Sequence, residues 1–203
     1  MSASLGPIHL WLYNKITFQD ELTTAILEYA KRKSYAKGDL ESVDQRFGTV
    51  ERGELAAIID ESNIHGWLQE RISITEARLA FIVTAVVEEH PESIAGINNV
   101  ACEFGKQHAV GPEIQVKDAY EYLDTILLNG MPCDGVNQIV SQTETIISWI
   151  QTVDIHKPYW DEVNGNVENY YAIRESLSTG IFENSQITYV QMSEQAFELR
   201  KEE

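Results

Sequence analysis

The sequence has few cysteines and no long apolar run. Its 203 residues include two cysteines, Cys102 and Cys133, which are too few for a disulfide framework, and we interpret both as free thiols in a reducing compartment. The longest apolar stretch, residues 79–87, is far shorter than the roughly 20 residues that span a bilayer. Residues 1–7 contain no basic segment that leads into an apolar run. The sequence therefore predicts a cytoplasmic protein without a membrane partner.

Positive charge is also scarce. Fifteen basic residues stand against 32 acidic ones, which gives a formal net charge of −17. An acidic protein of this kind repels nucleic-acid backbones and anionic lipid surfaces. The sequence also lacks a Gly-rich phosphate loop, a GxSxG motif, a CxxC motif and an EF-hand loop. We therefore expect no nucleic-acid partner and no nucleotide cofactor, whereas a small molecule, a protein partner or further copies of the chain in a homo-oligomer remain open.

One passage of the sequence occurs twice. The two copies match in register: Ile8, His9, Trp11, Leu12, Lys15, Ile16 and Thr17 correspond to Ile64, His65, Trp67, Leu68, Arg71, Ile72 and Ser73. Chance rarely duplicates a Trp and a His together with the surrounding apolar spacing. We therefore interpret the passages as the starts of two copies of one helical unit, at about residues 8–33 and 64–89.

Apolar residues follow the helical period through most of the chain. Asn63 is expected to cap one helix and Pro91 to stop it, and the alternative is a single bent helix through Asn63 and Gly66. No strand pattern of comparable length is found, so the predicted fold class is all-α, with one helical-bundle domain over residues 1–203. The seven or eight expected helices lie at about residues 7–33, 50–62, 64–89, 92–108, 116–128, 134–153, 158–182 and 186–200.

The histidines are the main indication of function. If successive helices alternate in direction, as short connections usually require, His9, His65, His108 and His156 fall at one end of the bundle. Imidazole is a suitable ligand for transition metals. Glu61 lies four residues before His65 and is a candidate carboxylate ligand. The sequence therefore predicts a metal-binding site, with zinc or iron as the metal, in a protein that could be a non-heme metal enzyme.

Other interpretations remain open beside the metal site. In the second hypothesis the histidines are structural, and the chain is a non-catalytic helical module that binds a protein partner or a small apolar ligand. Cys133 suggests a reactive thiol, because a helix N-terminus directly after it would lower its pKa, although Asp134 opposes that effect. Asp20 and Glu76, at equivalent positions of the repeat, are interpreted as rim residues paired with Arg or Lys. The catalytic residues and the reaction are not predicted.

Overall fold

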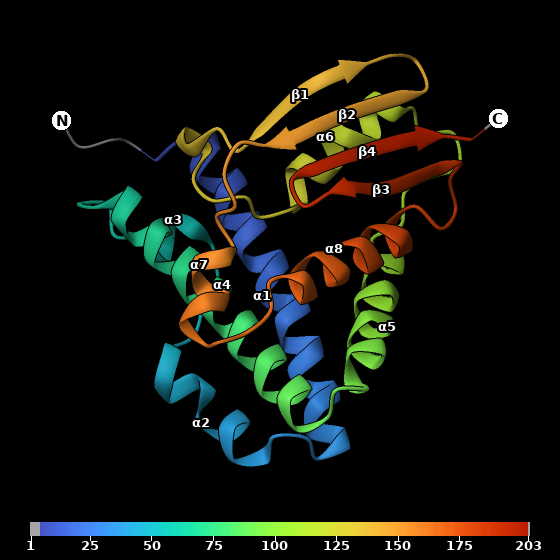
Figure 1. Ribbon diagram of the computed structural model, residues 1–203. Helices are drawn as coiled ribbons and strands as arrows, with labels where there is room; N and C mark the ends of the chain where they lie inside the picture. The colour runs from blue at the N-terminus through green and yellow to red at the C-terminus, as the bar shows by residue number, and fades with distance from the viewer. Residues whose placement is uncertain (1–4, 203) are drawn as a thin grey trace.

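Helices form most of the molecule, and an antiparallel sheet is formed by its C-terminal part (Figure 1). The structure is a computed structural model that describes residues 5–202. Within residues 5–202 the helices are α1 (Pro7–Lys33), α2 (Lys37–Phe47), α3 (Leu55–Ile58), α4 (Ile64–Glu89), α5 (Ser93–Lys106), α6 (Val116–Ile126), the 3₁₀ helix η1 (Pro132–Asp134), α7 (Lys157–Glu162) and α8 (Glu168–Ile181). The strands are β1 (Asn137–Gln142), β2 (Ile146–Gln151), β3 (Ile187–Ser193) and β4 (Ala196–Lys201). The fold is therefore mixed α/β, and the predicted all-α helical bundle is wrong.

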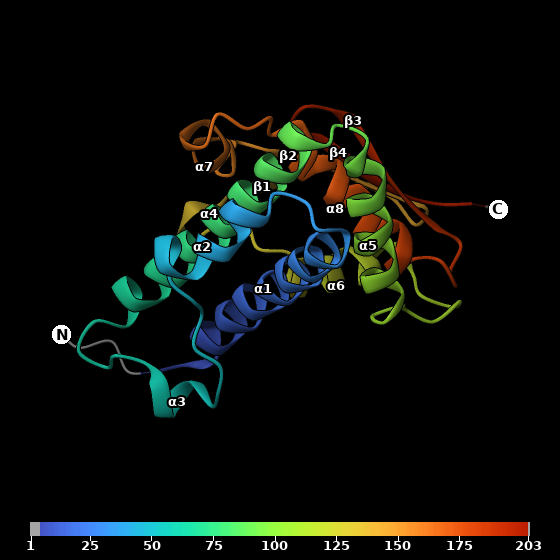
Figure 2. The same ribbon diagram turned by 90° about the horizontal axis from the view of Figure 1, so that it is seen from below.

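The two helices of the repeat, α1 and α4, lie side by side and run in the same direction (Figures 1 and 2). His9 contacts His65 near their first turns, and the backbone N–H that follows α1, at Ala36, donates to Glu89 at the end of α4. Equivalent apolar residues of the two copies share one core cluster: Leu12 and Leu68, and Ile16 and Ile72. The repeat therefore corresponds to a pair of parallel helices.

Local signals explain where these two helices begin and end. Pro7 occupies the first turn of α1, where its missing N–H has no helical partner, and Ser34 ends the helix in the left-handed region with φ of 60°. The Asn63 side chain accepts a hydrogen bond from the Gly66 N–H at 3.2 Å, so α4 begins at Ile64 with the predicted cap. The alternative of one bent helix through this region is wrong.

The connection between α1 and α4 runs back over the outside of the helix pair. It carries α2, whose buried residues Leu40 and Val43 pack on α4, and the short α3, whose Leu55 is buried at the other end of the pair. The helix expected at residues 50–62 is therefore reduced to the four residues of α3. Because this segment carries the chain back, α1 and α4 begin at the same end and run parallel, as expected for the first and third helices.

The four strands pair in the order β1-β2-β4-β3, and all their pairings are antiparallel. Residues 134–153 and 186–200 were predicted as helices, but they form the hairpins β1–β2 and β3–β4 instead. Burial alternates with a period of two residues, as in a strand: on β2, Ile147, Trp149 and Gln151 are buried while the residues between them are half-buried. The same alternation occurs at Phe197 and Leu199 of β4. In strands this short, a period of two residues resembled part of a helical pattern.

Helices α6 and α8 cover one face of the sheet (Figure 1). α8 also packs closely on α5, because Gly105 and Gly180 leave room for the opposite backbone: a Cβ on either would lie 2.1–2.2 Å from a carbonyl oxygen. The helix expected at residues 158–182 is interrupted at Asn164, which has φ of 55°, and is thereby divided into α7 and α8. This packing fixes α8 between the sheet and the α1–α4 pair.

Candidate functional site

The repeated histidines lie together at the start of the helix pair. Nε2 of His9 is 3.4 Å from Nε2 of His65, and Nδ1 of His9 accepts a hydrogen bond from the Gly6 N–H at 2.9 Å. The His9 side chain is buried, whereas His65 is exposed. The prediction that these two imidazoles lie at the same end of the molecule is confirmed.

The other expected ligands lie elsewhere. His156 is fully buried, and its Nδ1 is 3.1 Å from Oε2 of Glu76. Glu76 is eleven residues beyond His65 on α4, about 16 Å along the axis. His108 packs on the rings of two phenylalanines, and Glu61 is exposed in the turn before α4.

Within residues 5–202, the structure does not bring the predicted metal ligands together at one place. Among residues 5–202, no group of three His, Cys, Asp or Glu side chains is arranged to hold a metal ion. The other two histidines fail for different reasons: His108 packs on Phe18 of α1, nine residues beyond His9, and the helix expected to end near His156, at residues 134–153, is a β-hairpin.

The environment expected for Cys133 is also absent. Cys133 is exposed within the three-residue helix η1, and a strand, β1, follows at Asn137 where a long helix was expected. No helix dipole of the proposed kind therefore acts on its thiol.

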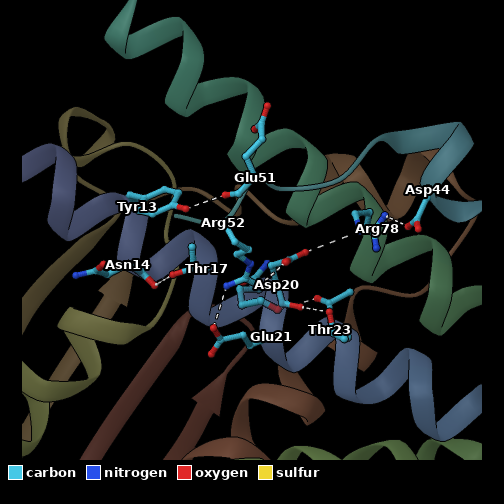
Figure 3. A network of polar contacts seen from close by, with 12 residues as sticks. Tyr13, Asn14, Thr17, Asp20, Glu21, Thr23, Asp44, Glu51, Arg52 and Arg78 are labelled. Atoms are coloured by element: carbon cyan, nitrogen blue, oxygen red, sulfur yellow. Dashed lines mark hydrogen bonds and ion pairs between the residues drawn. The ribbon is translucent and has the colours of Figure 1, made fainter. Parts of the chain in front are cut away.

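Asp20 and Glu76 occupy equivalent positions of the repeat but have different partners. Figure 3 shows Asp20 of α1 between Arg52, whose Nη2 is 2.5 Å away, and Arg78 of α4, whose Nε is 3.9 Å away. Glu76 is buried and accepts a hydrogen bond from Nε2 of Gln19 at 3.0 Å as well as contacting His156. The interpretation as an ion-paired acid is thus correct for Asp20, whereas Glu76 is a core residue.

Each copy of the repeat also places a cation over a tryptophan one turn earlier. In α4, the guanidinium of Arg71 lies 4.0 Å from the Trp67 ring centroid. Its Nε and Nη2 donate to the two oxygens of Glu51 at 2.7–2.9 Å. This bidentate pair of hydrogen bonds, here called the fork, neutralises the guanidinium charge, as is typical of Arg–carboxylate pairs. The Arg71 copy is therefore a structural contact.

The cation of the other copy is Lys15, and it has weaker partners. Its Nζ lies 3.6 Å from the Trp11 ring centroid and 3.7 Å from Oδ1 of Asp124. The Lys15 side chain is only 4% exposed. Burial, together with the positive charge of Arg174, lowers the pKa of the Lys15 amine to about 8, although Asp124 acts in the opposite direction. Lys15 is thus a desolvated amine whose one carboxylate neighbour, Asp124, is paired with it only loosely, at 3.7 Å.

Lys15 faces a pocket of about 270 Å³. The pocket lies between the start of α1, the end of α6 and the segment that leads from α6 to β1. Its wall is lined by Ile8, Trp11, Lys15, Tyr120, Asp124, Asn129, Gly130, Met131, Pro132, Gly135, Val136 and Asn137. One wall depends on Gly130, which has φ of 72° and leaves no space for a Cβ, since Asp134 Oδ2 would lie 2.6 Å away. That carboxylate accepts a hydrogen bond from the Met131 N–H, which holds the wall in place.

Buried polar groups lie directly behind this pocket, around a gap of about 10 Å³. Asn129 accepts a hydrogen bond from Nη1 of Arg174 at 2.8 Å, which connects α8 to the pocket wall. Within the described part of the chain, three buried atoms of this region lack a hydrogen-bond partner: Nε of Arg174, Nε1 of Trp149 and Oδ1 of Asn137. Unsatisfied buried polar groups are uncommon and frequently mark a place where water or a ligand binds.

A second, larger pocket of about 510 Å³ shares Gly130 with the first one. It lies beside α7, and the hydroxyls of Ser73 and Tyr159 are 3.2 Å apart in its wall. Its charged lining is acidic and consists of Glu76, Asp134, Asp154 and Glu162. Two of these carboxylates have structural roles, since Asp154 accepts backbone hydrogen bonds at the start of α7 and Asp134 does so in η1.

From the sequence alone, Lys15 stands out only as a matching position of the repeat. The signal that could have found it was its place on the apolar stripe, between Leu12 and Ile16 and one turn after Trp11. A lysine on a stripe that packs against a neighbouring helix is unusual, because lysine is almost never fully buried without a partner. The pocket itself could not be predicted, because its wall comes from α6 and from the segment before β1.

Comparison with protein families, with curated proteins and with solved structures gave no match. Among residues 5–202, no helix has the length and apolar character needed to cross a bilayer. Function is therefore inferred from the side chains and pockets of this chain.

Proposed function

We propose that this protein binds a small organic carboxylate in the pocket at Lys15. The observation that carries the proposal is the buried Lys15 ammonium, which lies beside an open pocket with its nearest carboxylate at 3.7 Å. A buried charge that is only loosely paired is unfavourable. An anion in the pocket would supply a second, closer counter-ion, and the resulting free energy would contribute to binding.

The pocket favours a small ligand with both polar and apolar parts. Its volume of about 270 Å³ is slightly below the usual range for small-molecule sites, about 300–1,000 Å³. Ile8, Met131 and Val136 provide apolar contacts, and the side-chain amides of Asn129 and Asn137 provide donors and acceptors. A short carboxylic acid of a few carbons fits this combination.

The groups behind the pocket suit one further ligand oxygen. Arg174 and Trp149, whose Nε and Nε1 groups lack hydrogen-bond partners, both line the gap of about 10 Å³, which is close to the space that one water needs. A ligand oxygen there would satisfy both donors. Asp124 lines both the gap and the pocket and adds a negative charge, so a monocarboxylate is expected to bind better than a dicarboxylate.

The proposal predicts ligand-dependent stabilisation of the folded protein. Monocarboxylic acids of three to six carbons are compared with their uncharged amides by thermal unfolding and by ligand-observed NMR. At ligand concentrations about 100 times the dissociation constant, the gain is about 2.7 kcal/mol. For a chain of this length, that gain raises Tm by roughly 5 to 10 °C. The amides should give smaller shifts, because they lack the charge that pairs with Lys15.

Two variants locate the effect. Lys15→Met should abolish the carboxylate-dependent shift, and Arg71→Met, the same change at the matching position of the other copy, should keep it. Equal shifts in both variants, or no shift with any acid in the unaltered protein, would contradict the proposal. Small-ligand binding was the second hypothesis from sequence, but the pocket that supports it is polar and charged, whereas an apolar ligand was expected.

A further inference from the structure

We propose that Lys15 is a nucleophile that forms a Schiff base with the carbonyl group of a small oxo acid. This inference rests on the proposed function, because the carboxylate of the ligand is what brings its carbonyl to the amine. The supporting features are a buried primary amine, an open pocket at that amine and a carboxylate beside it. Amines of this kind attack carbonyl carbons when they are desolvated or lie near another cation.

Both conditions hold at Lys15. The amine is desolvated by α1, α6 and the Trp11 ring, and its charged form is further opposed by the buried guanidinium of Arg174. With its pKa at about 8, about one tenth of the amine is neutral at pH 7, which is roughly 300 times the neutral fraction of an ordinary lysine. The neutral amine is the form that attacks.

Asp124 is placed to move the protons of the reaction. Its carboxylate, 3.7 Å from Nζ, accepts the proton that the Lys15 ammonium must lose before attack. The nitrogen lone pair then forms a bond to the carbonyl carbon, and the carbonyl oxygen takes the proton that the attacking nitrogen releases, which gives a neutral carbinolamine. Asp124 returns its proton to the hydroxyl, which leaves as water as the C=N bond forms. The balance is one ammonium and one carbonyl giving one iminium and one water, and no oxidant or reductant is needed.

Tyr120 is available to hold the carbonyl oxygen. It lines the same pocket, and burial together with the neighbouring Asp124 carboxylate raises the pKa of its phenol. The phenol therefore stays protonated at neutral pH and can donate a hydrogen bond to the oxygen on which negative charge develops. The equivalent cation in the other copy, Arg71, has no amine that can form an imine and is paired with Glu51.

The test traps the imine chemically. The protein is incubated with pyruvate, a 2-oxo acid, and sodium cyanoborohydride, and the modified peptides are identified and quantified by mass spectrometry. We expect one adduct at Lys15 that forms at least about tenfold faster than adducts at surface lysines, because far more of its amine is neutral. Lactate, which has the carboxylate but no carbonyl, should slow the reaction at Lys15 and leave the surface lysines unaffected.

Matched variants provide the controls. Lys15→Arg keeps the positive charge but cannot form an imine, so the adduct on the peptide containing residue 15 should disappear. Arg71→Lys places an amine at the matching position beside Glu51, and it should react no faster than a surface lysine. Slower adduct formation at Lys15 in the presence of lactate tests directly whether lactate occupies the pocket. This measurement uses the unaltered protein and does not depend on the folding of any variant.

The possible results separate this inference from the proposed function. If pyruvate and lactate both bind but cyanoborohydride gives no preferred adduct at Lys15, the Schiff base is wrong and carboxylate binding stands. If neither acid binds and no preferred adduct forms, both proposals are wrong. If Lys15 reacts with pyruvate at the same rate in the unfolded protein, the pocket has no part in the reaction and the inference is overturned.

Discussion

The two copies of the repeat differ in what surrounds their cation. Arg71 of α4 lies over Trp67 and forms a paired fork with Glu51, so its charge is satisfied within the protein. Lys15 of α1 lies over Trp11 in the same way, but its carboxylate neighbour is 3.7 Å away and a pocket opens beside it. One helical unit has thus been used once as a structural contact and once as the wall of a pocket. The residue type follows this difference, since Arg suits a fixed fork and Lys a reactive amine.

The largest effect that we expect from this comparison concerns the pH dependence of stability. A folded Lys15 releases its proton near pH 8, whereas an unfolded lysine keeps it to about 10.5. Between these values the unfolded state binds more protons, so raising the pH favours the folded state. From pH 7 to 10.5, the free energy of unfolding of the unaltered protein should therefore rise by about 3 kcal/mol relative to that of Lys15→Met. Urea unfolding of both proteins across this range measures the difference.

A control for this prediction is Arg71→Met. Arginine stays charged throughout the range, so the difference between the unaltered protein and Arg71→Met should not change between pH 8 and 10.5. If the difference between the unaltered protein and Lys15→Met is equally flat, the Lys15 amine is not desolvated in the way described.

The next effect concerns stability at neutral pH. Arg71→Met removes the fork to Glu51 and should destabilise the protein by about 2 kcal/mol, as is typical of lost charge-assisted hydrogen bonds. Lys15→Met removes a poorly paired buried charge and replaces it with a side chain of similar length. At pH 7 it should cost nothing or increase the free energy of unfolding. Urea unfolding at pH 7 measures the free energy of unfolding of both variants. Equal decreases in the two would contradict the distinction between a well-paired Arg71 and a poorly paired Lys15.

Most of the helical part could be predicted from the sequence, because its signals are local. The start of α1 at Pro7, the cap of α4 at Asn63 and the duplicated unit all follow from residues close together in the chain. The sheet could not be predicted in this way. The strands of its two hairpins are short, and the outer strand β1 is exposed, so its residues show no alternation at all. What fixes these strands is their pairing with one another, which is not a local property.

The candidate site could be predicted only in part. The repeat indicated correctly that His9 and His65 lie together. His108 and His156 were placed with them in error, because α5 ends beside Phe18 of α1 and the helix expected at residues 134–153 is a β-hairpin. Lys15 was visible as a repeated position, but its importance depends on Asp124 of α6 and Arg174 of α8. Both residues are more than a hundred positions further along the chain, and only the tertiary fold brings them close.

The measurement that tests the central claim most directly is the pKa of the Lys15 amine. The lysines can be labelled by reductive methylation with ¹³C-formaldehyde and titrated by NMR, and Lys15→Arg identifies the signal of residue 15. A desolvated amine beside Arg174 should titrate near pH 8 and should move to a higher pKa when a carboxylate occupies the pocket, because the anion favours the charged amine. A Lys15 signal that titrates near 10.5, with or without carboxylate, would contradict the account of this pocket.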